Sequence, residues 1–170
     1  MKKLIQLVLL MFMALSLTAQ DKPAREDLKL GSKIPQFTLE SSVYGNVTPA
    51  DLKGKVVLVN LFATWCPPCQ KELAEVKDVL WPKYKDNKNF KMLVIGREHT
   101  DADLTKYNEK KGFAFPLYPD PKREVFSLFA DQTIPRSYLY DKNGKLIWSA
   151  IGYSPEEFKV MMEAIEKALK

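Results

Sequence analysis

Short apolar runs alternate along this chain with stretches whose apolar residues have helical spacing. Residues 55–63 contain the run Val-Val-Leu-Val-Asn-Leu-Phe, which has the length of a strand and is rich in β-branched residues. A run of this kind predicts a strand that is covered on both faces of a sheet. Further strands are expected at 36–41, 92–96, 113–118, 137–140 and 146–151.

Two turns are predicted from their residue types. Tyr44-Gly45-Asn46, which precedes Val47, follows the strand at 36–41 and predicts a short hairpin near the N-terminus. Asn143-Gly144 separates the last two strands, and this pair is typical of a tight hairpin turn in which both residues have a positive φ. The last two strands are therefore expected to be antiparallel neighbours.

Helices are expected at 67–84, 103–111, 122–130 and 154–169. Pro67 and Pro68 begin the first helix. Backbone N–H groups in the first turn have no acceptor within the helix, so the missing N–H of proline costs no hydrogen bond there. Pro82 is expected to kink or end the same helix. Ser154 and Glu157 have the spacing of a capping box at the start of the last helix.

The order of these elements predicts one α/β domain. Strands alternate with helices up to residue 130, and a hairpin and a final helix follow. This order predicts a mixed central sheet flanked by helices, with parallel and antiparallel pairs. The function has to be inferred from a site, because folds of this class support many chemistries.

The first 30 residues differ from the rest. Lys2 and Lys3 precede an apolar stretch that ends at Ala19, which is the layout of a secretory signal peptide. The stretch is shorter than the roughly 20 residues of a membrane-spanning helix. We expect residues 1–19 to be cleaved, although Ser16 offers another cut site and a buried first helix is the alternative. Residues 20–30 are expected to be a mobile tether, residues 31–170 the domain, and the protein to be periplasmic or otherwise extracytoplasmic.

The charge argues against nucleic-acid binding. The full chain has a formal charge of +5, and removing Lys2 and Lys3 with the signal peptide leaves +3. The remaining lysines lie beside acidic residues rather than in one basic stripe, so no nucleic-acid partner is expected.

The two cysteines of the chain are Cys66 and Cys69. A structural disulfide across so short a loop would stabilise the fold weakly. A metal site would need further ligands, and the sequence offers one histidine, His99; haem attachment would need histidine where Gln70 stands. Redox chemistry fits best, because the pair lies between a buried strand and a helix N-terminus, which favours a thiolate. Cys66 is then the nucleophile and Cys69 the resolving thiol.

The segment Trp65-Cys66-Pro67-Pro68-Cys69 after a buried strand resembles the active site of the thioredoxin superfamily. Asn60, Phe62, Thr64 and Glu72 make it similar to the exported TlpA/ResA-type thiol-disulfide oxidoreductases in particular. The resemblance covers roughly residues 30–170. It implies a thioredoxin-like fold with two additions, an N-terminal β-hairpin and a central strand-helix insertion.

The resemblance also implies roles for several residues. Glu72 would handle the proton of the second thiol, because Asn60 stands where thioredoxins have an aspartate; an exposed glutamate without a role is the alternative. Trp65, Pro67, Pro68, Ile134 and Pro135 would form the substrate-binding surface, with a cis bond at Ile134-Pro135. Arg136 departs from the family pattern; it would lie near the cysteines as a cation or face solvent. No metal and no cofactor besides the Cys66–Cys69 disulfide are expected.

The resemblance finally implies a reductase. Electrons from a membrane-embedded donor would pass to disulfides of exported proteins such as apocytochromes c, and the protein would act as a monomer. A disulfide oxidase or isomerase of the same fold is the main alternative. A peroxidase of the peroxiredoxin type fits less well, since the residues before Cys66 lack that group's proline and threonine pattern, and a non-catalytic binding module is a further alternative.

Overall fold

The structure is a computed structural model, and it describes residues 28–170. The predicted signal peptide, residues 1–19, lies outside the described residues, as does most of the predicted tether, residues 20–30. Of the tether, Leu28 is partly buried and packs against the domain, whereas Leu30 is exposed.

A five-stranded mixed sheet forms the centre of the domain. Its order is β3-β2-β1-β4-β5. β1 is parallel to β2 and antiparallel to β4, β2 is parallel to β3, and β4 is antiparallel to β5. The predicted α/β fold with a mixed sheet is confirmed. The strands are β1 (Val56–Phe62), β2 (Phe90–Arg97), β3 (Leu117–Asp120), β4 (Arg136–Tyr140) and β5 (Leu146–Ile151).

The central strand β1 is buried along its whole length, as its continuous apolar run predicts. Because successive side chains of a strand point to opposite faces, β1 contributes to two clusters. Val56, Leu58 and Phe62 belong to the cluster on one face. Val57, Val59 and Leu61 belong to the cluster on the other face.

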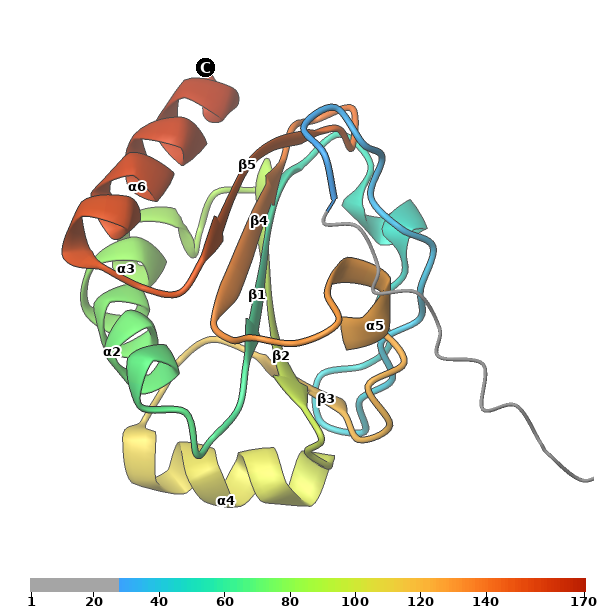
Figure 1. The fold of residues 1–170 in the computed structure, drawn as a ribbon, viewed down its shortest axis with the longest axis vertical. Coiled ribbons are helices and arrows are strands. Elements are labelled where there is room, and N and C mark those ends of the chain that lie inside the picture. Colours follow the sequence, from blue (N-terminus) through green and yellow to red (C-terminus); the bar gives the residue numbers. More distant parts are fainter. Residues whose placement is uncertain (1–27) are drawn as a thin grey trace, which may run out of the picture.

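Helices cover both faces of the sheet (Figure 1). On one face lie α2 (Pro67–Glu75), α3 (Trp81–Tyr84) and α6 (Pro155–Leu169). On the other lie α5 (Phe126–Phe129) and the N-terminal segment with the short helix η1 (Pro49–Leu52). The helix α4 (Asp101–Lys111) lies at the end of the sheet where β1 and β2 terminate. The cysteine loop is therefore next to α4.

Pro82 does not end the first long helix. Between α2 and α3 the chain forms one widened, π-helical segment, η2 (Val76–Leu80), in which the Trp81 N–H donates to the carbonyl of Val76, five residues back. Widening the turn before a proline accommodates its ring and its missing N–H. The helix therefore continues to Tyr84.

The turn between β4 and β5 differs from its prediction. Gly144 has a positive φ of 69°, but Asn143 is not among the residues with positive φ. The side chain of Asp141 explains this, because its Oδ1 accepts from the backbone N–H groups of both Asn143 and Lys145. The expected pair of left-handed residues is wrong, and a longer turn with glycine at its final bend replaces it.

Both predicted additions to the sheet are present, but each is shorter than predicted. The N-terminal hairpin forms as one isolated antiparallel bridge between Leu39 and Val47. The inserted strand, β3, begins at Leu117 instead of residue 113 because Phe113 and Phe115 turn inward and stack on each other with ring centroids 4.7 Å apart. The following helix is only α5, since Asp120 accepts from the N–H groups of Val125 and Phe126 and fixes its start there.

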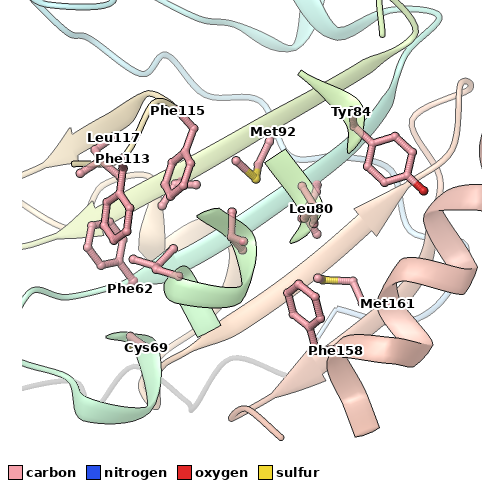
Figure 2. Close-up of a cluster of buried hydrophobic side chains, with 14 of the residues drawn as sticks. Phe62, Cys69, Leu80, Tyr84, Met92, Phe113, Phe115, Leu117, Phe158 and Met161 are labelled. Carbon is pink, nitrogen blue, oxygen red and sulfur yellow. The ribbon is translucent and has the colours of Figure 1, made fainter. Parts of the chain in front are cut away.

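Figure 2 shows part of the cluster beneath α2 and α6, which includes the aromatic residues Phe62, Phe115 and Phe158. Cys69 lies at the margin of this cluster, on the first turns of α2. The end of α2 that carries the cysteines is thus anchored in the core of the domain.

Candidate active site

The two cysteines form a disulfide at the start of α2. Cys66 is the residue that caps the helix, and its Sγ lies 3.3 Å from the backbone N–H of Cys69, which donates to it. Cys66 is 3% exposed and Cys69 is fully buried. A donated N–H and the positive end of the helix dipole both favour negative charge on the Cys66 sulfur.

The Ile134-Pro135 bond lies opposite the disulfide and is cis, as the resemblance implied. The Cys66 Sγ is 3.8 Å from the carbonyl oxygen of Ile134. Ile134 is partly buried and Pro135 is buried, so that this loop forms one wall beside the sulfur. Pro67 and Pro68 are exposed on the other side.

Glu72 is buried beneath the disulfide, with 4% of its surface exposed, so the alternative of an exposed helix glutamate is wrong. It lies three residues after Cys69 and therefore on the same side of α2. The Ser137 hydroxyl donates to Glu72 Oε1 over 2.9 Å and accepts from the Asn60 side-chain amide. Burial raises the pKa of Glu72 from its ordinary value of 4.5 to about 7, and its neighbours Asn60 and Ser137 lower it in part.

Trp65 is 59% exposed and is therefore not a core residue. The guanidinium carbon of Arg97 lies 5.5 Å from the centre of its ring and 5.1 Å from the ring of Phe126. Arg97 also forms a 2.9 Å ion pair with Glu98. The exposed indole ring beside Cys66 is thus stacked on an arginine that is itself fixed on two sides.

Arg136 does not face solvent, since only 7% of its surface is exposed. Its Nε donates to the carbonyls of Gln132 and Thr133, and its Nη1 lies 3.4 Å from the hydroxyl of Tyr138. Ser137, the next residue of β4, points toward Glu72. Arg136 therefore points to the opposite face of the sheet and supports the loop before Pro135 from behind.

Two residues of this region were not predicted from the sequence. Ser137 links Asn60 to Glu72, and its position two residues after Pro135 on a buried strand was the available signal. His99 lies in the loop after β2, is buried and accepts the backbone N–H of Thr64 at Nε2 over 3.0 Å. Its position two residues after the parallel strand β2, at the edge where sites of α/β folds form, was the available signal.

Residues 28–170 contain neither a cluster of potential metal ligands nor a helix suited to cross a membrane. The described side chains include no group of three or more histidine, cysteine, aspartate or glutamate residues that could hold a metal ion. Within the same residues, no helix has the length and apolar character needed to cross a membrane.

Comparison with known proteins places this site in a family. A family model described as "AhpC/TSA family" matches residues 30–149. The chain belongs to the AhpC/TSA family. The thiol-disulfide oxidoreductase ResA of Bacillus thuringiensis (strain Al Hakam) is 30% identical to this AhpC/TSA protein over 133 residues, which are 78% of this chain and 76% of the relative. The predicted resemblance to TlpA/ResA-type proteins is confirmed.

Solved structures agree with this relation. The solution structure of a proposed protein disulfide isomerase from Bacteroides thetaiotaomicron matches with a TM-score of 0.79 and 31% identity, over 84% of this chain and 91% of the other. A proposed thiol:disulfide interchange protein DsbE from Chlorobium tepidum matches with a TM-score of 0.75 and 28% identity, over 85% and 100%. The AhpC/TSA protein is therefore an oxidoreductase with a thioredoxin-like fold, and it exchanges thiols with the disulfides of protein substrates.

Proposed function

We propose that this protein is an extracytoplasmic reductase that transfers electrons from a membrane-embedded donor to disulfides of exported proteins, including apocytochromes c. The observation that carries the proposal is a helix-capping Cys66–Cys69 pair with a buried carboxyl group, whose pKa is about 7, three residues beyond it. The protein acts as a monomer, and its disulfide pair is its only redox group.

Cys66 makes the first bond. In the reduced protein its thiolate attacks one sulfur of the substrate disulfide, a new S–S bond forms, and the substrate S–S bond breaks to release one substrate thiolate. The Cys69 N–H, which points at the Cys66 sulfur, stabilises the thiolate before the attack. Trp65, Pro67 and Pro68 contact the substrate from one side, and the backbone of Ile134 before Pro135 pairs with it from the other.

Cys69 completes the reaction. Its thiol loses a proton to Glu72, whose Oε2 has no hydrogen-bond partner among the described residues and whose pKa of about 7 suits an acceptor at neutral pH. The Cys69 thiolate attacks the Cys66 sulfur, the Cys66–Cys69 bond forms, and the second substrate sulfur leaves as a thiolate. The substrate gains two electrons, and the donor then reduces the Cys66–Cys69 disulfide again.

The direction of transfer is supported by the similarity to TlpA/ResA-type proteins. Isomerisation is the second candidate, because a structure with 31% identity belongs to a proposed disulfide isomerase. Reduction potentials of thioredoxin-like proteins span about 150 mV between thioredoxin and the oxidase DsbA. Equilibration of the pair with a glutathione series measures this potential. A value near that of thioredoxin supports the reductase, and a value near that of DsbA contradicts it.

The substrates can be identified by trapping. With Cys69→Ala the mixed disulfide on Cys66 cannot be resolved, so exported substrates should remain attached and be released by a reducing agent. A double variant, Cys66→Ser with Cys69→Ala, is the matched control and should retain none of them. Recovery of apocytochromes c from the single variant supports the named substrate class, and their absence in cells that produce them contradicts it.

A further inference from the structure

His99 contacts the loop that carries the reactive cysteine. It lies between β2 and α4 and is 8% exposed. Its Nε2 accepts the backbone N–H of Thr64, which lies between the end of β1 and Cys66. The ring belongs to the only histidine of the sequence, and the exchange mechanism above gives it no part.

The hydrogen bond fixes the protonation state of the ring. A backbone N–H is always a donor, so the His99 Nε2 that faces it carries no proton, and the ring is neutral with its proton on Nδ1. Burial lowers the pKa of His99 below 6.5. The charged neighbours are Asp103 of α4 and Glu98 of the loop, which raise this pKa, and Arg97 of β2, which lowers it. Phe62 packs on the ring from β1 and carries no charge.

The Thr64 peptide is also held at its carbonyl. The side-chain amide of Gln70 donates to Thr64 O over 2.9 Å, and Lys111 Nζ donates to Gln70 Oε1 over 3.0 Å. The Cys66 N–H donates to the carbonyl of Ala63 and closes the turn. Three hydrogen bonds thus determine the path of residues 63–66. Of these three, only the hydrogen bond to His99 involves a side chain of a type that titrates near neutral pH.

Gly96 and Glu98 determine the position of the His99 ring. A Cβ atom built on Gly96 would lie 3.3 Å from His99 Cδ2 and 2.8 Å from Leu104 Cδ2, so the absence of a side chain at 96 makes room for both. Glu98 has a φ of 61°, a conformation unfavourable for a residue with a Cβ atom, and this bend directs the chain back so that His99 reaches Thr64.

We propose that His99 is a positioning residue for thiol-disulfide exchange: its neutral ring holds the backbone that presents Trp65 and Cys66, and protonation of the ring releases it. The proposal rests on the proposed function in that Cys66 is the reacting thiol. A protonated Nε2 would direct its N–H at the N–H of Thr64, so the bond cannot survive and the turn has to move. The protein then loses reactivity reversibly in mildly acidic solution.

A structural measurement tests the first half of the proposal. In NMR spectra of the oxidised protein, the single imidazole should titrate below 6.5, and the amide signals of Thr64 and Cys66 should shift with the same midpoint. Amide signals that stay constant through the titration of the ring overturn the proposal. This measurement needs no activity, so it remains decisive even if Cys66 fails to reduce protein disulfides.

A kinetic comparison tests the second half. His99→Gln places a carbonyl oxygen as many bonds from Cα as Nε2, and this acceptor does not titrate. His99→Asn is the matched control, since its side-chain oxygen is one bond closer to Cα and does not reach the N–H of Thr64. The probe is the rate at which reduced protein reacts with 2,2′-dithiodipyridine from about pH 5 to about pH 8, across the range in which histidine titrates.

The variants have distinct expected rates. Relative to His99→Gln, the wild type should be equal near pH 8 and about three- to tenfold slower near pH 5, the range of one lost hydrogen bond. His99→Asn should be slow by a similar factor at both pH values. A wild type that follows His99→Gln throughout, or a His99→Asn protein as fast as the wild type near pH 8, overturns the proposal. If none of the proteins reacts with 2,2′-dithiodipyridine, the role of Cys66 as the reacting thiol is refuted instead.

Discussion

Replacing Glu72 by glutamine should stabilise the protein in neutral and alkaline solution. Glutamine keeps the shape of the side chain and an oxygen that can accept from Ser137, but it carries no charge to desolvate. In the wild type the carboxyl is buried at 4% exposure and becomes charged only as the pH approaches its raised pKa of about 7. The variant avoids that ionisation.

The size of the effect follows from linkage. The pKa of Glu72 rises from 4.5 to about 7 on folding, and each unit is equivalent to about 1.4 kcal/mol, which gives about 3 kcal/mol. Because the folded pKa is the higher one, the native state binds more protons than the unfolded chain between these values. The contribution of Glu72 to the free energy of unfolding is therefore fully present below pH 4.5 and is lost as the pH rises through 7.

Urea unfolding of the oxidised proteins measures this loss. The advantage of Glu72→Gln over the wild type should increase by about 3 kcal/mol between about pH 4 and pH 8, a difference in midpoint of about 1 M or more at ordinary urea dependence. Groups that titrate equally in both proteins cancel in the comparison. A stability difference that changes by less than about 1 kcal/mol across this range refutes the raised pKa.

Three further changes have defined outcomes. Ser137→Ala removes a donor to Glu72 Oε1, so the pKa of Glu72 should rise further and the pH dependence of urea unfolding should shift to higher pH; an unchanged profile contradicts this. Gly96→Ala places a Cβ 2.8 Å from Leu104 Cδ2 and should lower the free energy of unfolding by about 1–3 kcal/mol, a loss that Leu104→Ala should reduce in the double variant. Ser154→Ala removes the acceptor of the Glu157 N–H at the start of α6 and should lower stability by about 1 kcal/mol in thermal unfolding, with no change in the reactivity of Cys66.

Most of the fold was predictable because its signals are local. The run at 55–63 is long, apolar and β-branched, and it becomes β1 at Val56–Phe62. Gly112, at the end of the predicted helix 103–111, has a φ of 63° and ends α4. The disulfide and the cis bond at Ile134-Pro135 were also predicted, the first from spacing and the second from the resemblance.

The errors arose where a side chain outweighs a local preference. Asp141 captures two backbone N–H groups and changes the turn at Asn143, although Asn-Gly by itself favours another geometry. The sequence positions of Ser137 and His99 carried a signal of a buried site, but their hydrogen-bond partners were not predictable, because each partner lies more than 30 residues away in the chain. Such bonds are determined by the register of the sheet, which a single sequence does not reveal.

Reduction of the disulfide should make the burial of Glu72 more unfavourable. Cys69 and Glu72 lie on the same side of α2, and a thiolate formed there would add a second negative charge beside a carboxyl that is already desolvated. Like charges oppose each other's ionisation, so the two groups share one proton over a wide pH range and titrate as a pair. The Cys69 thiol therefore holds the shared proton while Glu72 is ionised, and the proton passes to Glu72 when Cys69 forms its bond to Cys66. The same burial that weakens the fold at neutral pH thus couples proton transfer to the redox state of the pair.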